Sequence, residues 1–188
     1  MTVSETAAGG RSLEETLERL VADVPDFPEP GVGFKDITPL LADHAGFSQV
    51  VEALAAPARD ADGNVTVTKV LGMESRGFIL GAPAALHLGV GFVPVRKAGK
   101  LPRETHAVSY SLEYGEATLE IHTDAVAPGE RVLVIDDVLA TGGTAAATIE
   151  LVERCGGVVA GVSVLLELGF LDPRSKLPDT PVHSLLVS

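Results

Sequence analysis

Two neighbouring carboxylic acids, Asp136 and Asp137, follow an apolar stretch at 131–135 and precede the segment Ala-Thr-Gly-Gly-Thr. Glycines let backbone N–H groups approach an anion closely, and the amino end of a following helix adds a favourable dipole. The two threonines supply hydroxyl donors, and the carboxylates can accept hydrogen bonds from vicinal hydroxyl groups. The alternative interpretation is an acidic strand end followed by a capped turn. We interpret the pattern as a phosphate-binding loop beside a site for vicinal hydroxyls, formed by Asp136, Asp137, Ala140, Thr141, Gly142, Gly143 and Thr144.

This loop differs from the common nucleotide-binding loops. Gly99-Lys100 is followed by Leu101, so G-x-x-x-x-G-K-[ST] is absent, and no strand is followed by G-x-G-x-x-G. Four of the 14 basic residues fall at 96–103, although the chain has 26 acidic residues. This basic cluster is a second candidate for anion binding, and its alternative is a solvated loop. The five histidines lack metal-ligand spacing.

The net charge of −12 at pH 7 limits the function classes. Proteins that bind nucleic acid usually present surplus Lys and Arg to the phosphates, and docking on an anionic membrane also needs basic residues. We therefore expect neither a nucleic-acid nor a membrane partner. A single cysteine allows no intrachain disulfide, and no apolar run reaches the ~18 residues of a bilayer span. These features favour a cytoplasmic protein.

The elements that would position these residues alternate between strands and helices. Strands are predicted at 65–71, 91–96, 131–135, 158–166 and 182–187. Helices are predicted at 13–24, 47–54 and 145–153, and a further helix after residue 77 ends near residue 88. Alternating polarity at 108–114 and 117–122 predicts an antiparallel pair. The order implies an α/β domain with a mainly parallel sheet. We expect residues 11–188 to form a single domain and residues 1–10 to be a disordered tail.

Residues 132–144 closely resemble the phosphoribosyl pyrophosphate (PRPP) signature of the type I phosphoribosyltransferases. Other segments resemble motifs of the adenine phosphoribosyltransferases within that family. They are 26–40, with its prolines, glycines and Phe34; Glu74-Ser75-Arg76-Gly77-Phe78; and 96–115, which includes Ser109-Tyr110-Ser111-Leu112-Glu113-Tyr114-Gly115. The motifs occur in the family's order, so the resemblance covers the chain from about Asp26 to its end.

The resemblance implies a role for each matching residue. Asp136 and Asp137 would hold the ribose hydroxyls, and the loop from Ala140 to Thr144 would bind the 5-phosphate. Pyrophosphate would be bound by Glu74, Ser75, Arg76, Arg96, Lys97 and Lys100. Adenine would be bound by Gly33, Phe34, Lys35 and Leu168. Glu113 would act as the catalytic acid/base near purine N7.

Three of these roles have ordinary structural alternatives. Phe34 could be a core anchor, Leu168 could be strand core, and Glu113 could be an exposed strand residue like Glu120. A carboxyl group on a covering loop, between Leu112 and Tyr114, could have its pKa raised by desolvation. That shift would suit Glu113 to proton transfer.

The resemblance also implies a fold, a reaction and an assembly. The fold would be type I phosphoribosyltransferase-like, with a mainly parallel central sheet flanked by helices, a small N-terminal hood and a mobile β-hairpin lid. A non-proline cis peptide is expected at Glu74–Ser75, and the assembly would be a homodimer. The substrates would be adenine and PRPP and the products AMP and pyrophosphate, as in purine salvage. Mg²⁺ would arrive on the pyrophosphate, with no direct protein ligand.

Two other functions remain open from the residues. One is a related enzyme that uses another purine, such as xanthine or hypoxanthine. The other is a regulatory protein that keeps the fold, senses PRPP and binds DNA or RNA. The negative charge and the lack of an added DNA-binding domain count against the second.

Overall fold

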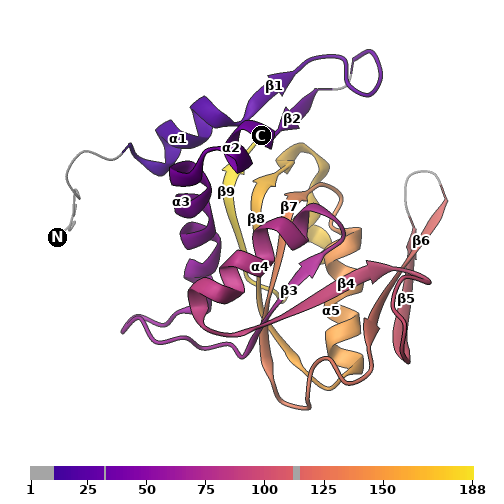
Figure 1. Cartoon of the computed structure of the whole chain (residues 1–188). Coiled ribbons are helices and arrows are strands. Elements are labelled where there is room, and N and C mark those ends of the chain that lie inside the picture. Colours follow the sequence, from indigo (N-terminus) through magenta and orange to yellow (C-terminus); the bar gives the residue numbers. More distant parts are fainter. Residues whose placement is uncertain (1–10, 32, 112–114) are drawn as a thin grey trace. The chain divides into compact units, whose positions relative to one another are not determined.

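The computed structural model describes residues 11–31, 33–111 and 115–188, shown in Figure 1. The chain divides into two compact units, Met1–Val50 and Val51–Ser188. Whether residues 11–188 behave as one domain stays a prediction.

The N-terminal unit combines short helices with a two-stranded sheet. Helix α1 (Leu13–Leu20) starts at a capping box. The Ser12 hydroxyl oxygen accepts a hydrogen bond from the Glu15 N–H, and the Glu15 carboxylate accepts one from the Ser12 N–H. Strand β1 (Ala22–Val24) pairs antiparallel with β2 (Phe34–Asp36). Helices α2 (Thr38–Ala42) and α3 (His44–Ala55) follow, and α3 continues into the second unit.

The helix expected at 13–24 is therefore too long. Its last residue is Leu20, and Val21 has extended backbone angles of φ −98° and ψ 106°. Residues 22–24 instead pair with residues 34–36. Strand pairing, which joins residues distant in sequence, overrides the helical periodicity that continues to Val24.

The second unit contains a seven-stranded sheet in the order β5-β6-β4-β3-β7-β8-β9. Strands β4, β3, β7, β8 and β9 are mutually parallel, and β5 and β6 add an antiparallel hairpin beside β4. The strands are β3 (Lys69–Met73), β4 (Gly91–Lys97), β5 (Thr105–Ser111), β6 (Glu116–His122), β7 (Arg131–Leu139), β8 (Val158–Glu167) and β9 (Val182–Val187). The helices are α4 (Arg76–Leu88) and α5 (Gly143–Arg154), with 3₁₀ turns η1 (Ala56–Ala58), η2 (Gly169–Leu171) and η3 (Pro173–Lys176).

This arrangement confirms the predicted α/β fold with a mainly parallel sheet and the predicted antiparallel pair. Two boundaries differ. The strand expected at 65–71 begins at Lys69, because Val65 forms an isolated bridge with Arg59 instead. The strand expected to end at residue 135 continues to Leu139, because β8 pairs with it along that length. The two aspartates therefore lie within the last part of β7.

Helices α4 and α5 pack on opposite faces of the sheet. Val132 and Val134 of β7 belong to the core that includes Leu151 and Val152 of α5. The intervening residues of the strand point to the other face, where Gly77 of α4 closely approaches the backbone of β7. Cys155 is 8% exposed and belongs to the core beside α5.

None of the helices in the described part of the chain has the length and apolar character that a bilayer span requires.

Candidate active site

The carboxyl ends of β3 and β7 form a topological switch point. The chain runs from β3 through α4 to β4 on one side, and from β7 through α5 to β8 on the other, while β3 and β7 are neighbours. In open α/β sheets ligands bind in the crevice outside such strand ends. The predicted sugar, phosphate and pyrophosphate residues lie in the last part of β7 and β4 or directly after β3, β7 and β4, so the fold brings them to one edge.

The carboxylate pair at the end of β7 is buried and asymmetric. Asp136 and Asp137 are 9% and 6% exposed. Burial raises the pKa of Asp136 well above its ordinary value, and the nearby charge of Asp137 raises it further. Asp136 Oδ1 accepts a hydrogen bond of 2.9 Å from the Asp137 N–H, and Asp137 forms an ion pair with Arg76 at the start of α4. The pair thus combines one desolvated carboxyl with one balanced by a cation.

The predicted phosphate-binding loop lies between β7 and α5. A cavity of about 70 Å³ is lined by Met73, Val138, Leu139, Ala140, Thr141, Gly142, Thr144 and Ala145. Gly142 has a left-handed conformation (φ +78°), and a Cβ on it would lie 2.5 Å from the carbonyl oxygen of Pro173. No acidic residue lies in the first turn of α5, and Gly142 has no side chain to cap it. The amino end of the helix can therefore face an anion.

Glu74 connects the segments proposed for pyrophosphate binding. Its peptide bond to Ser75 is cis, as expected. Its carboxylate accepts hydrogen bonds from Lys100 Nζ at 2.5 Å, from the Lys97 N–H at 3.0 Å and from Arg96 Nε at 3.4 Å. The hydrogen bond from Lys100, more than the weaker effect of Arg96, lowers the pKa of Glu74. The anionic Glu74, which follows β3, therefore holds Arg96, Lys97 and Lys100 close to the end of β3.

Leu168 follows β8 and is half-buried, and its N–H donates to the Leu139 carbonyl at 2.9 Å. The adjacent Glu167 is only 4% exposed. It accepts two hydrogen bonds from Arg174, at 2.8 and 2.7 Å, and one from the Ser184 hydroxyl at 2.5 Å. The Arg174 partner lowers the pKa of Glu167. The Glu167–Arg174–Ser184 network therefore links the end of β8 to η3 and to β9.

Sequence reasoning missed that network. A charged residue ending an apolar strand was a signal for Glu167, since such a group needs a partner when buried. The sequence carries no comparable signal for Arg174, because η2 and η3 have no apolar periodicity that places it.

Other predicted residues belong to the N-terminal unit or lie outside the described residues. Phe34 is half-buried in β2, with its ring centroid 5.0 Å from that of Phe27 in an edge contact. Lys35 Nζ lies 2.6 Å from Asp23 Oδ1. Gly33 is exposed immediately before β2. Glu113 lies outside the described residues.

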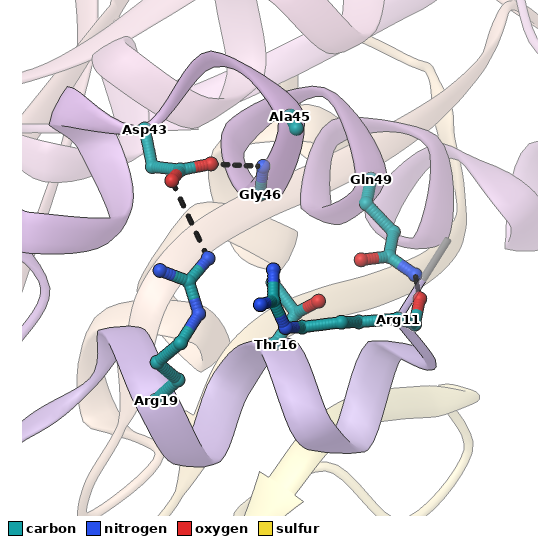
Figure 2. Close-up of a pocket in the computed structure, with 7 residues that line it drawn as sticks. All are labelled: Arg11, Thr16, Arg19, Asp43, Ala45, Gly46 and Gln49. Atoms are coloured by element: carbon teal, nitrogen blue, oxygen red, sulfur yellow. Dashed lines mark hydrogen bonds and ion pairs between the residues drawn. The ribbon is translucent and has the colours of Figure 1, made fainter. Parts of the chain in front are cut away.

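The N-terminal unit also contains a cavity of about 360 Å³. Figure 2 shows its lining: Arg11, Thr16, Arg19, Asp43, Ala45, Gly46 and Gln49. The Arg19 guanidinium lies 3.3 Å from the Asp43 carboxylate, which also accepts from the Gly46 N–H at 2.8 Å. None of the residues predicted for the site lines this cavity.

The carboxylates beside the predicted phosphate-binding loop are of the ligand type that suits Mg²⁺. Over residues 11–31, 33–111 and 115–188, no group of three or more His, Cys, Asp and Glu side chains is arranged to hold a metal ion. Carboxylate oxygens suit Mg²⁺, which keeps several waters when bound beside phosphates. Asp136 and Asp137 are the carboxylates placed next to the phosphate-binding loop.

Comparison with known proteins places the chain among relatives of one kind. A family model for the phosphoribosyl transferase domain matches residues 40–180. A relative from a Nocardioides species, an adenine phosphoribosyltransferase, is 67% identical over 186 residues, which are 99% of each chain.

Solved structures give the same result. The adenine phosphoribosyltransferase of Rhodothermus marinus is 55% identical with a TM-score of 0.85, covering 94% of this chain and 98% of the other. The Saccharomyces cerevisiae enzyme, solved with adenine and an imino-altritol bisphosphate, is 41% identical with a TM-score of 0.87, covering 93% and 98%. Both similarities extend over nearly the whole chain.

Proposed function

This chain belongs to the adenine phosphoribosyltransferase family, and from that premise we propose how its residues carry out the reaction. It transfers the 5-phosphoribosyl group of PRPP to adenine, which gives AMP and pyrophosphate and serves purine salvage. The fold is the type I phosphoribosyltransferase fold.

The observation that carries the proposed site is the convergence at the β3–β7 switch point. Two buried carboxylates and an uncapped helix amino end meet beside a small cavity there. We assign the ribose hydroxyls to Asp136 and Asp137 and the 5-phosphate to Ala140, Thr141, Gly142, Gly143 and Thr144. Hydroxyl groups donate well to carboxylates, and an oxyanion is stabilised by backbone N–H and hydroxyl donors.

Pyrophosphate leaves with high negative charge, so its site needs cations and N–H donors. Arg76, Arg96, Lys97 and Lys100 supply the positive charge in this proposal. Glu74 holds Lys100 and Arg96 in place through the hydrogen bonds described above. We also assign Ser75, which follows the cis Glu74–Ser75 peptide bond, to the pyrophosphate site.

For adenine, we assign Gly33 and Lys35 to the edge of the base through their backbones, Phe34 to stacking, and Leu168 to apolar contact. Glu113 is the proposed acid/base at purine N7. These assignments come from the family resemblance together with the residue chemistry. Backbone hydrogen bonds to the edge of the base can distinguish a 6-amino from a 6-oxo purine, whereas stacking on an aromatic ring holds either base.

The rate enhancement then comes mainly from positioning. The reacting carbon passes through an oxocarbenium-like state, whose charge develops as the bond to pyrophosphate lengthens. The carboxylates fix the ribose, the loop fixes the 5-phosphate, and the basic residues stabilise the departing oxygens. Asp136 and Asp137 also contribute negative charge close to the ribose.

We propose that Mg²⁺ binds with PRPP. It would neutralise part of the pyrophosphate charge, and Asp136 and Asp137 are the residues that would hold it, through water. We also propose a cytoplasmic homodimer without nucleic-acid or membrane partners, in line with the acidic composition.

One assay tests the choice of base. The protein is supplied with PRPP and Mg²⁺ and with adenine, hypoxanthine, guanine or xanthine separately, and nucleotide formation is measured. We expect kcat/KM for adenine to exceed that for hypoxanthine at least ~100-fold. Equal use of a 6-oxopurine would contradict the assignment of the base site. Retention on nucleic acid at low salt would favour the regulatory alternative.

A further inference from the structure

Thr144 of the phosphate-binding loop has a side-chain partner that its proposed role does not explain. Its hydroxyl lies 3.1 Å from the hydroxyl of Tyr110 on β5. Within the described residues this is the only hydrogen bond of the Thr144 side chain, since Thr148 bonds to the Thr144 backbone carbonyl instead. The hairpin strand and the loop are thus joined at one hydroxyl pair.

The position of Tyr110 is set by packing as well as by that hydrogen bond. A Cβ on Gly143 would lie 3.1 Å from Cδ2 and 3.6 Å from Cε2 of Tyr110, so the ring contacts the first residue of α5. At the other end of α5, Arg154 Nη1 donates to the Ala107 carbonyl of β5 at 2.5 Å. Strand β5 is therefore attached to α5 at two points, and the Tyr110 hydroxyl is held over the loop.

The direction of the hydrogen bond follows from the ligand's chemistry. Phosphate oxygens near neutral pH are mainly acceptors, and a threonine hydroxyl has a single proton to donate. If Thr144 donates to the 5-phosphate, it cannot also donate to Tyr110, so Tyr110 must donate to Thr144. A chain from the Tyr110 O–H through the Thr144 O–H to the phosphate is also cooperative, because each bond polarises the next.

We propose that Tyr110 is a positioning residue for the 5-phosphate: its hydroxyl donates to Thr144 and directs the Thr144 proton to the substrate. This inference rests on the proposed role of Thr144. It adds to the site a residue from the hairpin that belongs to neither the loop nor the basic cluster. The aromatic ring supports the loop, whereas the hydroxyl orients the donor.

Tyr110→Phe tests the hydroxyl alone, because it keeps the ring against Gly143. We expect KM for PRPP and the inhibition constant of ribose 5-phosphate to rise about three- to tenfold, the effect of one neutral hydrogen bond. The inhibition constant of pyrophosphate, KM for adenine and the melting temperature should stay unchanged. Ser109→Ala is the matched control. It removes an exposed hydroxyl of the same strand, which pairs with Thr118 at 2.7 Å, and should alter none of these values.

A double-mutant cycle with Thr144→Val completes the test. If Tyr110 acts through Thr144, adding Tyr110→Phe to Thr144→Val changes KM for PRPP no further. If Tyr110→Phe raises KM for PRPP in the Thr144→Val background by the same factor as in wild type, Tyr110 acts independently of Thr144, and the proposal is overturned. Normal PRPP kinetics in Tyr110→Phe, alongside weakened binding in Thr144→Val, would reject the Tyr110 proposal alone. Normal kinetics in Thr144→Val would reject the phosphate assignment and, with it, this inference.

Discussion

At the scale of single residues, the two aspartates of β7 show how binding chemistry opposes stability. Asp136 is almost fully buried, and its ionised form is opposed by desolvation and by Asp137. An acid whose pKa is higher in the folded than in the unfolded protein destabilises the fold once the pH exceeds the unfolded pKa. The protein keeps this group because, in our proposal, a carboxylate there accepts hydrogen bonds from ribose.

Asp136→Asn should therefore separate the two effects. At pH 7.5 we expect a melting temperature equal to or a few degrees above wild type, with the difference shrinking as the pH falls towards ~4. kcat/KM for PRPP should fall at least ~10-fold, because a neutral amide accepts ribose hydrogen bonds less strongly.

Asp137→Asn is the matched comparison, since it weakens the ion pair with Arg76 and should bring no gain in stability. Calorimetry with steady-state kinetics measures both quantities. A clear loss of melting temperature in Asp136→Asn would contradict this account of its burial.

Glu113 carries the second prediction at this scale. Glu113→Gln should bind adenine nearly as well as wild type but lose at least ~100-fold in kcat, the low end of a general acid/base contribution. Adenine binding is measured by calorimetry and turnover by steady-state kinetics. Near-normal turnover would remove Glu113 from the mechanism and leave positioning and pyrophosphate stabilisation to explain the rate.

At the scale of elements, the segment after β8 packs against the proposed phosphate-binding loop. η3 contains Pro173, whose carbonyl lies where a Cβ on Gly142 would need to be, and Arg174, which forms two hydrogen bonds with Glu167. The Glu167–Arg174–Ser184 network therefore connects Leu168, the loop and the strand β9.

Arg174→Gln should cost about 1–2 kcal/mol of unfolding free energy at pH 7, because the buried Glu167 loses a charged partner that is itself half exposed. The pKa of Glu167 is lowered in the folded protein, so the pair's contribution is present above the unfolded pKa of ~4.3 and is lost as the pH falls through the lower folded value. Denaturant unfolding measured from pH 7 to pH 3.5 should show that the difference in unfolding free energy between variant and wild type becomes smaller as the pH falls.

Arg103→Gln is the control. It breaks an ion pair with Asp124 whose side chains are 60% and 64% exposed, and it should leave stability unchanged within error. Equal losses in both variants would mean that burial of Glu167 has no special effect.

At the scale of the whole molecule, charge is unevenly placed. The chain carries a net charge of −12, yet basic residues gather at the end of β4 around Glu74. Local cations in an acidic protein can hold a pyrophosphate group without making the surface attractive to nucleic acid.

We expect two copies to associate in solution, with the interface near the residues proposed for pyrophosphate binding. Arg96 or Lys100 would then lie close to the active site of the other copy. Light scattering should give twice the 19.4 kDa mass of one chain. Activity should fall on dilution below the concentration at which the dimer dissociates. A monomer that retains full activity would reject this assembly.

Much of the second unit was predictable because its signals are local. Apolar runs predicted the parallel strands, and the position of Asp136 to Thr144 at the carboxyl end of a buried strand followed from the same pattern. The end of α1 and the length of β7 were not predictable, because each depends on pairing with another strand. The Arg174 partner of Glu167 was not predictable although it lies only seven residues away, because η2 and η3 have no apolar periodicity that places it. The contact of Tyr110 with Thr144 was not predictable either, because it joins residues far apart in the chain.

The burial of Cys155 has a practical consequence for measuring motion of the hairpin. It is the only cysteine of the chain, and burial raises the pKa of its thiol, so we expect it to react slowly with maleimides at neutral pH. A cysteine introduced at the exposed Glu116, at the start of β6, can then be labelled selectively without replacing the native thiol. A fluorophore or spin label at that position would test, on an otherwise unmodified enzyme, whether the hairpin opens and closes as the family resemblance predicts.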